Sequence, residues 1–246
     1  MAIMAPLGED GPQGGSAETL FFVHIPKCAG SSFRQVLNRW FGKDALFLDT
    51  HDPGALEQAL AARPAPPRAI AGHMPFALHE ALAAPSCLVS LVRHPLDRFV
   101  SVWRHARRTP ADPLHEAAAR MDLEAFYHFT LGDERAFRRT VAVQCQFLGG
   151  ARSFEAAREA IDRRYFLAAP VERYEAFVQA CALRFGRPAA IPPARNVSPD
   201  APIPEGVRTR LLPRIAADHG EDLGVYRYVC ETFEDRLVSL GGVAGA

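Results

Sequence analysis

A lysine, a glycine and two serines come together where a short apolar run changes into a helical pattern. The stretch LFFVHIPKCAGSSFRQVLNRWFG, residues 20–42, carries Lys27, Gly30, Ser31 and Ser32 at this junction. Glycine lets the backbone approach a ligand closely, and the unpaired N–H groups and the dipole at a helix start favour an anion. With one ammonium and two hydroxyl groups added, the turn is predicted to bind an anion the size of a phosphate.

The same turn does not match the common ATP-binding loop. The Walker A pattern G-x-x-x-x-G-K-[ST] places its lysine after the glycine, whereas Lys27 precedes Gly30 and no glycine opens the loop. This order argues against an ordinary ATPase. Taken alone, the stretch is equally consistent with a plain helix N-cap at Ser31 or Ser32 behind a solvated lysine.

A second basic residue follows a second apolar run. The run CLVSLV, residues 87–92, ends at Arg93, and Ser101 lies about two helical turns further on. Helical spacing after Pro95 is seen in the apolar residues Leu96, Phe99, Val100 and Trp103. A guanidinium offers a planar fork to phosphate oxygens, and a serine adds a donor. Two such strand ends, each leading into a helix, predict two phosphate subsites in one chain.

These two stretches resemble the nucleotide-binding motifs of one enzyme family. FVHIPKCAGSSF resembles the 5'-phosphosulfate-binding loop of sulfotransferases, especially the carbohydrate, heparan 2-O-sulfotransferase-like type and its bacterial relatives, with a signature close to H-I-P-K-T-[AG]-G-[ST]-[ST]. LVRHPLDRFVSVW resembles the 3'-phosphate-binding stretch, close to R-[DH]-P-x-x-R-[FL]-x-S-x-[YW]. The motifs stand in the family's order and approximate spacing, and weaker similarity extends over about residues 20–240. Cys28 stands where the family usually has threonine.

The resemblance implies a cofactor, a reaction and a set of binding residues. The cofactor is 3'-phosphoadenosine 5'-phosphosulfate (PAPS), which leaves as 3'-phosphoadenosine 5'-phosphate (PAP), and its sulfuryl group moves to a hydroxyl of a carbohydrate or other small-molecule acceptor without a metal ion. An ammonium at the breaking bond stabilises the transition state, so Lys27 is also implied as a catalytic residue. The implied set is Lys27, Gly30, Ser31 and Ser32 for the 5'-phosphosulfate, and Arg93 and Ser101 for the 3'-phosphate.

The acceptor hydroxyl also needs a base, and a histidine is expected to supply it. Imidazole, with an ordinary pKa of about 6.5, suits proton removal near neutral pH. In carbohydrate sulfotransferases a glycine-histidine pair between the two phosphate motifs carries the base, and by that resemblance it is His73 in AIAGHMPF. His51 and His79 are the alternatives. His24, inside the first apolar run, is expected to be a core histidine with its hydrogen bonds satisfied, and His219 to lie on a helix surface.

The apolar patterns predict alternating strands and helices. Strands are expected at residues 20–25, 46–48, 69–72, 87–92 and 165–169, with helical segments between and after them. This alternation indicates a parallel sheet flanked by helices, which binds ligands beyond the carboxyl ends of its strands. With the resemblance, the expected class is an α/β, P-loop NTPase-like fold with a largely helical C-terminal half. Residues 1–18 are expected as a flexible tail and residues 19–241 as a single sulfotransferase domain.

Composition narrows the function classes. The 246 residues include 28 Lys+Arg and 28 Asp+Glu, so the strong basic charge of nucleic-acid or anionic-membrane binding proteins is missing. The five cysteines form no metal-binding pattern, and no apolar run approaches the roughly 20 residues of a membrane helix. The expectation is a cytoplasmic protein with no nucleic-acid partner, no membrane span and no metal site. Arg104, Arg107 and Arg108 are expected as a solvated helix end, with attraction of an acidic acceptor as the alternative.

Two other functions stay open at this point. A P-loop-type phosphotransferase would share the fold, but it needs a Ser or Thr directly after its lysine and a carboxylate for Mg²⁺, and the sequence shows neither clearly. A non-catalytic nucleotide-binding protein is disfavoured because Lys27 and His73 are both present. Asn196 and Ser198, in the proline-rich segment 188–204, either close over the nucleotide or form a capped turn. The sequence specifies neither the acceptor nor the oligomeric state.

Overall fold

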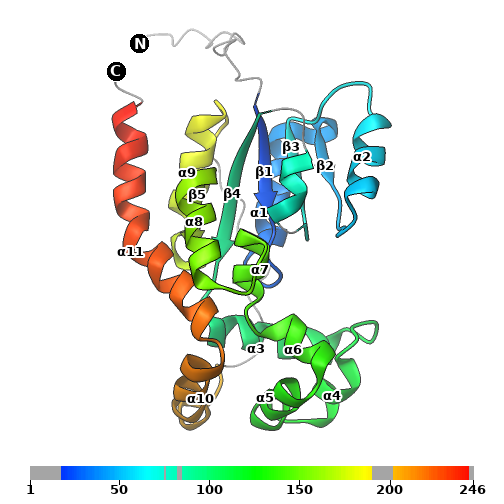
Figure 1. Ribbon diagram of the computed structural model, residues 1–246, viewed down its shortest axis with the longest axis vertical. Helices are drawn as coiled ribbons and strands as arrows, with labels where there is room; N and C mark the ends of the chain where they lie inside the picture. Colours follow the sequence, from blue (N-terminus) through cyan, green and yellow to red (C-terminus); the bar gives the residue numbers. More distant parts are fainter. Residues whose placement is uncertain (1–17, 75, 82–84, 190–201, 244–246) are drawn as a thin grey trace, which may run out of the picture.

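A five-stranded parallel sheet lies at the centre of the computed structural model, which describes residues 18–74, 76–81, 85–189 and 202–243. The strand order is β2-β3-β1-β4-β5 (Figure 1). The predicted α/β class, with a P-loop NTPase-like parallel sheet and a largely helical C-terminal half, is confirmed, and each predicted strand lies within two residues of its place. The strands are β1 Thr19–Val23, β2 Ala45–Phe47, β3 Ala69–Gly72, β4 Ser86–Val92 and β5 Tyr165–Pro170.

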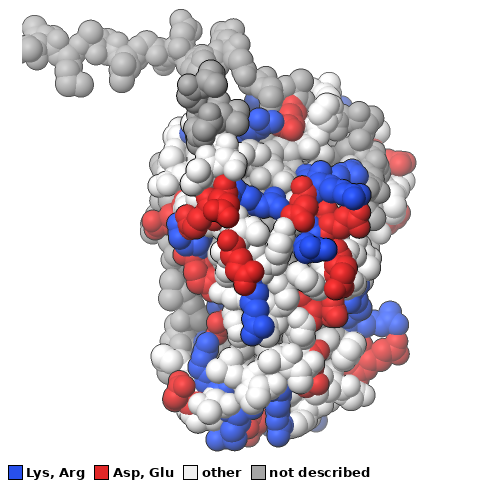
Figure 2. Space-filling view, turned by 60° about the vertical axis from the view of Figure 1, so that its left-hand side comes forward, with Lys and Arg blue, Asp and Glu red and all other residues white. Residues whose placement is uncertain are grey.

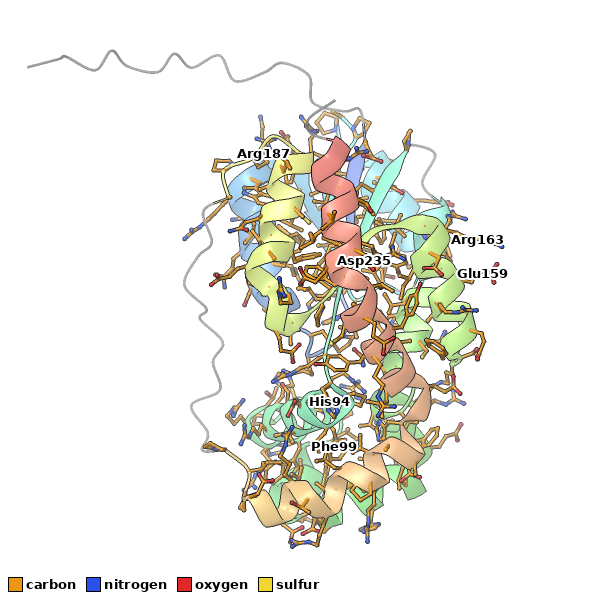
Figure 3. All side chains as sticks on the ribbon, turned by 90° about the vertical axis from the view of Figure 1, so that its left-hand side faces the viewer. His94, Phe99, Glu159, Arg163, Arg187 and Asp235 are labelled. Carbon is orange, nitrogen blue, oxygen red and sulfur yellow. The ribbon has the colours of Figure 1, made fainter. Side chains whose placement is uncertain are left out.

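The central strands are apolar along their whole length because helices cover both faces of the sheet. All five residues of β1 are buried, so that the neighbouring rings of Phe21 and Phe22, which point to opposite faces, are both excluded from solvent. α1 and α9 lie on one face, where the rings of Phe33 and Phe177 meet at 4.9 Å between centroids. α7 and α8 lie on the other face, and α11 runs along β5 at the sheet edge (Figures 1 and 3). The bounds are α1 Gly30–Phe41, α2 Pro53–Ala61, α7 Val143–Gly149, α8 Phe154–Arg164, α9 Tyr174–Arg184 and α11 Gly220–Val243.

The ends of α1 and α2 follow directly from their sequences. The buried face of α1 is the predicted apolar stripe, and the helix ends at Gly42, whose φ of 50° is a conformation that glycine adopts without strain. α2 starts at Pro53 after Asp52, whose side chain accepts a hydrogen bond from the backbone N–H of Gly54 at 2.9 Å. Short 3-10 helices lie at Gly42–Asp44, Phe76–Ala81 and Val171–Arg173.

A further group of helices lies beyond the carboxyl ends of the strands (Figure 1). It has its own apolar core, in which Phe99, Phe126 and Tyr127 are fully buried. His219 is buried against the rings of Phe99 and Tyr127, so its predicted surface position is wrong; the joint between α10 and α11 packs into this core. The helices of this group are α3 Pro95–Arg108, α4 His115–Arg120, α5 Leu123–Gly132, α6 Glu134–Thr140 and α10 Glu205–Asp218.

The charged surface agrees with the balanced composition. On the face shown in Figure 2, acidic and basic side chains alternate without a large area of one sign. Exposed pairs one helical turn apart, such as Glu159 with Arg163 on α8, contribute to this mixture (Figure 3). Within the described ranges, no helix combines the length and the apolar character that crossing a bilayer requires.

Candidate active site

Three neighbouring strands lead into the predicted site residues. β1 is hydrogen-bonded to β3 on one side and to β4 on the other. Lys27 follows β1, His73 follows β3, and Arg93 follows β4 directly. Because the carboxyl ends of parallel strands meet at one edge of the sheet, residues from three separate motifs are brought together there.

The Lys27 loop is a tight turn that opens onto the start of α1. Lys27 and Ala29 both have positive φ, 69° and 56°, and Ala29 is the N-cap residue of the helix. No side-chain cap from the described part of the chain satisfies this helix end, and its first turn has no acidic residue. The alternative of an N-cap at Ser31 or Ser32 is therefore wrong, because both serines lie inside the first turn. The loop retains the free N–H groups and the dipole that favour an anion.

Gly30 is required because the imidazole of His24 occupies the space where a side chain would stand. A Cβ atom at position 30 would lie 1.8 Å from Cδ2 of His24. The ring of His24 lies 4.1 Å from the ring of His73, and burial lowers the pKa of His24 to about 3. His24 is in the core as expected, but its Nδ1 finds no hydrogen-bond partner among the described residues, so the expectation of a satisfied histidine is wrong.

The two turns predicted to bind phosphate touch. Nη1 of Arg93 donates a hydrogen bond to the backbone oxygen of Lys27 at 3.3 Å. The pKa of Lys27 is lowered, first by burial and then by the positive charges of Arg108 and Arg93. Lys27, Arg93 and Arg108 thus lie close together at the carboxyl ends of the strands. An anionic ligand with more than one phosphate would neutralise their positive charge.

His73 is held in an orientation that suits a base. Its backbone N–H donates to Oδ1 of Asp49 at 2.8 Å, and its Nδ1 lies 3.2 Å from the carbonyl oxygen of His24. A carbonyl oxygen only accepts, so the contact places the proton of the neutral ring on Nδ1 and leaves the lone pair on Nε2. Burial, the largest cause, lowers the pKa of His73 below its ordinary value of 6.5. The ring is therefore neutral and basic at Nε2 near neutral pH.

Of the two alternative histidines, His79 is less suited to that role, and His51 stays an alternative. His79 is buried in the 3-10 helix, with Nδ1 against the carbonyl oxygen of Phe76 and Nε2 3.1 Å from Nη2 of Arg164. Neither nitrogen is left for an acceptor hydroxyl. His51 is exposed and packs edge-on against Phe147 at 6.1 Å, and its charge contributes to lowering the pKa of His73.

Comparison with known proteins identifies the family. The model of the sulfotransferase family matches residues 16–144, which include both motifs. The chain belongs to the sulfotransferase family. Two solved structures share the fold at low sequence identity: a sulfotransferase from Alicyclobacillus acidocaldarius (15% identity, TM-score 0.52, covering 85% of this chain and 96% of that one) and mouse sulfotransferase SULT7A1 complexed with PAP (14% identity, TM-score 0.56, covering 87% and 89%). No curated protein matches the chain.

A buried glutamine, Gln144, links the two motifs of this sulfotransferase, and sequence reasoning missed it. Gln144, fully buried in α7, accepts from the backbone N–H of Arg93 and donates to its carbonyl oxygen, both at 2.9 Å. The thiol of Cys28 donates to the same amide oxygen at 3.6 Å. Cys28 therefore points into the core, which explains why a thiol is tolerated where the family usually has threonine. A polar residue inside the apolar run VAVQCQFL was the available signal.

A buried acidic residue fixes Gln144 in turn. The carboxylate of Asp222 in α11 accepts hydrogen bonds at 2.9–3.1 Å from the backbone N–H groups of Val143, Gln144 and Cys145, the first residues of α7. Arg98 of the second sulfotransferase motif is also fully buried, and its Nη2 lies 4.0 Å from Asp222. The start of α7 is therefore anchored by an ion pair that the sequence pattern did not reveal.

Three predicted binding residues lie outside the turns described so far. Ser101 lies half-buried in α3, two turns after the end of β4. Asn196 and Ser198 lie outside the described residues.

Proposed function

We propose that this sulfotransferase transfers the sulfuryl group of PAPS to a hydroxyl of a carbohydrate or other small-molecule acceptor. The observation that carries the proposal is the contact between the Lys27 loop and Arg93 at the start of α1. It holds two cationic side chains and an uncapped helix N-terminus close together. A nucleotide with phosphate groups at both its 5' and 3' positions needs such a pair of adjoining anion subsites.

The residues present fit this cofactor. Lys27, the backbone at Gly30, and the hydroxyls of Ser31 and Ser32 would hold the 5'-phosphosulfate, while Arg93 and Ser101 would hold the 3'-phosphate. The lowered pKa of Lys27 among other cations supports the fit, because a bound dianion would relieve their mutual repulsion. PAPS, when bound, supplies the activated sulfuryl group for transfer.

The protein's own contribution to the reaction is made by two side chains. Nε2 of His73 takes the proton of the acceptor hydroxyl, while the carbonyl of His24 orients the ring and the carboxylate of Asp49 holds the backbone N–H of His73. The ammonium of Lys27 stabilises the negative charge that develops at the 5'-phosphate end. Both groups act from turns that the sheet fixes, so little reorganisation accompanies the chemical step.

The proposal is tested by comparing nucleotides. PAP should raise the melting temperature of the protein far more than ATP with Mg²⁺ at the same concentration, because only PAP fills both phosphate subsites. Transfer of labelled sulfate from PAPS to a panel of sugars and small alcohols then identifies the acceptor class. An equal or larger response to ATP with Mg²⁺, with no sulfate transfer to any acceptor, would favour a phosphotransferase.

A further inference from the structure

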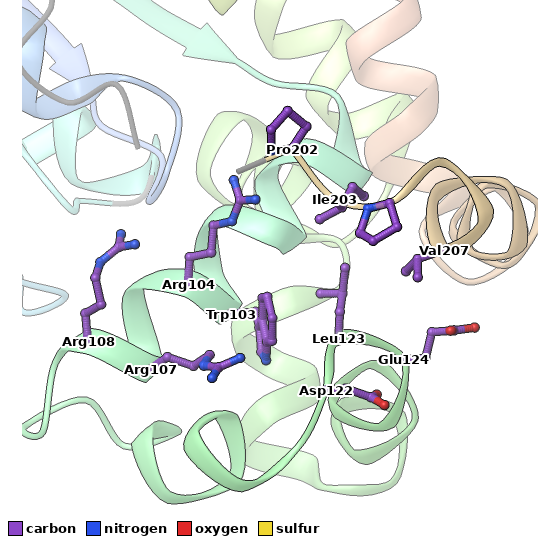
Figure 4. Close-up of a pocket in the computed structure, with 11 residues that line it drawn as sticks. Trp103, Arg104, Arg107, Arg108, Asp122, Leu123, Glu124, Pro202, Ile203 and Val207 are labelled. Atoms are coloured by element: carbon purple, nitrogen blue, oxygen red, sulfur yellow. The ribbon is translucent and has the colours of Figure 1, made fainter. Parts of the chain in front are cut away.

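A pocket of about 530 Å³ lies beside α3, between the start of α5 and the segment that leads into α10 (Figure 4). Trp103 and Arg107 of α3 form its floor, and Arg104 stands at its side with the guanidinium directed toward Pro202. Leu123, Ile203 and Val207 form its apolar wall. The volume is much larger than one phosphate or sulfate ion needs and falls in the range of small-molecule sites.

The α3 side of the pocket is basic. Arg104, Arg107 and Arg108 all line it. The guanidinium of Arg107 lies over the ring of Trp103, 4.6 Å from its centroid, and Nε1 of Trp103 donates to the carbonyl oxygen of Met121 at 3.3 Å. The indole is therefore fixed, and it holds a guanidinium at the pocket by a cation–π contact.

Two acidic residues line the opposite side of the pocket, and each has a partner on its own side. Glu124 accepts two hydrogen bonds from the guanidinium of Arg210, at 2.6 and 2.9 Å. Oδ1 of Asp122 accepts from the backbone N–H of Ala125 at 2.8 Å and so caps α5. A ligand in this pocket would meet arginines at one end and an aromatic and aliphatic surface beside them.

The pocket is distinct from the proposed nucleotide subsites. Successive residues of an α-helix are rotated by about 100°, so Trp103 and Arg107 lie about 160° and 120° around α3 from Ser101. The residue proposed for the 3'-phosphate thus lies on another side of the helix. Arg104 lies about 60° and Arg108 about 20° around α3 from Ser101, so Arg108 is on the Ser101 side of the helix. The effect of Arg108 on the pKa of Lys27 shows that the pocket adjoins the Lys27 loop.

We propose that this pocket binds an amphipathic organic anion, whose carboxylate, sulfate or phosphate pairs with Arg107 while its apolar part packs between Trp103 and Val207. The inference does not depend on PAPS as cofactor. Arg107 and Arg108 are exposed in the last turn of α3, as expected of a solvated helix end, and Arg107 in addition adjoins a fixed indole and an aliphatic wall.

Calorimetric titration with naphthalene-2-sulfonate tests the proposal, with the uncharged naphthalene-2-sulfonamide as the matched probe. The sulfonate should bind to the full chain, and the sulfonamide at least about 10-fold more weakly, because charge-assisted hydrogen bonds are lost. Arg107→Gln should weaken sulfonate binding to a similar degree. Val207→Glu, which adds a negative charge to the wall and leaves the arginines in place, should do the same. Arg138→Gln, at an exposed arginine of α6, is the control and should bind as the wild type.

Titration in the presence of saturating PAP separates this pocket from the nucleotide site. The sulfonate should bind with the same affinity whether or not PAP is present, and Arg93→Ala should not change it. Displacement of the sulfonate by PAP would assign the pocket to the nucleotide and overturn the inference. So would equal affinity for the sulfonamide, or unchanged sulfonate binding in the Arg107→Gln and Val207→Glu variants.

Discussion

The guanidinium of Arg93 donates a hydrogen bond to the carbonyl oxygen of Lys27, although the two residues belong to different motifs and follow different strands. The amide of Gln144 holds the backbone of Arg93 and contacts the thiol of Cys28 next to Lys27. The spacing between the two proposed anion subsites is therefore fixed by hydrogen bonds that link Lys27, Arg93, Gln144 and Cys28. It does not depend on the flexibility of either loop.

Replacement of Arg93 tests the second subsite. Arg93→Ala should weaken PAP binding about 10- to 100-fold, because a hydrogen bond to a charged group contributes roughly 1.5–3 kcal/mol. Isothermal titration calorimetry measures the change. Arg138→Ala, an exposed arginine paired with Glu134 on α6, is the matched control and should leave the affinity unchanged. A dissociation constant within twofold of the wild type would remove Arg93 from the nucleotide site.

Replacement of His73 tests the base. His73→Ala should retain PAP binding and lose sulfate transfer by about 100-fold or more, the usual contribution of a general base. In the wild-type enzyme the base is active when unprotonated, and burial lowers the pKa of His73. The rate should therefore rise with pH through a midpoint below 6.5 and be level at pH 7. If His73→Ala still transfers sulfate, with the same fall in rate at low pH as the wild type, the base is another residue.

The sequence predicted the elements that carry the site because their signals are local. Residues 20–25 and 87–92 are apolar runs that only a sheet covered on both faces buries, and the glycine and proline signals around α1 and α2 mark real helix ends. Lys27, His73 and Arg93 were predicted to lie close together because the carboxyl ends of parallel strands meet at one end of the sheet.

Contacts between distant segments could not be predicted in the same way. Gln144 and Asp222 are 78 residues apart and meet only because α11 packs against α7. His219 was misplaced for a similar reason, since a polar residue between two helices looks exposed until their packing is known. The pocket of Trp103 and Arg107 likewise forms only when residues near 203 return to α3.

The close approach of Gly30 to His24 predicts a strong effect of a single methyl group. Gly30→Ala places a Cβ against the imidazole, so the protein should lose about 1–3 kcal/mol of unfolding free energy through overpacking, together with PAP binding. Thermal unfolding and calorimetry measure the two losses. Gly132→Ala, at the end of α5 where no described atom lies within 4 Å of the added carbon, should be neutral or slightly stabilising. Equal stability of the two variants would contradict the packing argument.

Loss of the Gln144 amide should disturb both motifs at once. Gln144→Ala removes a partner from the backbone N–H and from the carbonyl of the part-buried Arg93, at a cost of up to about 1–3 kcal/mol for each group, and should also weaken PAP binding. Gln144→Glu retains the acceptor but loses the donor and buries a carboxylate facing the carbonyl oxygen of Arg93, so it should be at least as disruptive as the alanine variant. Gln146→Ala, in the same helix with its amide on the carbonyl of Gly150, is the control for α7 itself. If Gln146→Ala weakens PAP binding as much, the effect is one of general helix stability.

Buried uncharged histidines predict a loss of stability in mild acid. Burial lowers the pKa of His24 to about 3 and that of His219 to about 4, below the 6.5 of an unfolded chain, so the unfolded state binds more protons below pH 6.5. Their contribution to stability is complete above pH 6.5 and is lost as the pH falls toward 4, by up to about 1.4 kcal/mol per pH unit for each histidine. His219→Phe, which keeps a ring between Phe99 and Tyr127, should reduce this slope in urea unfolding between pH 6.5 and 4.5. The exposed His128→Asn is the control and should keep the wild-type slope. An unchanged slope in His219→Phe would mean that the imidazole already gains its proton in the folded protein.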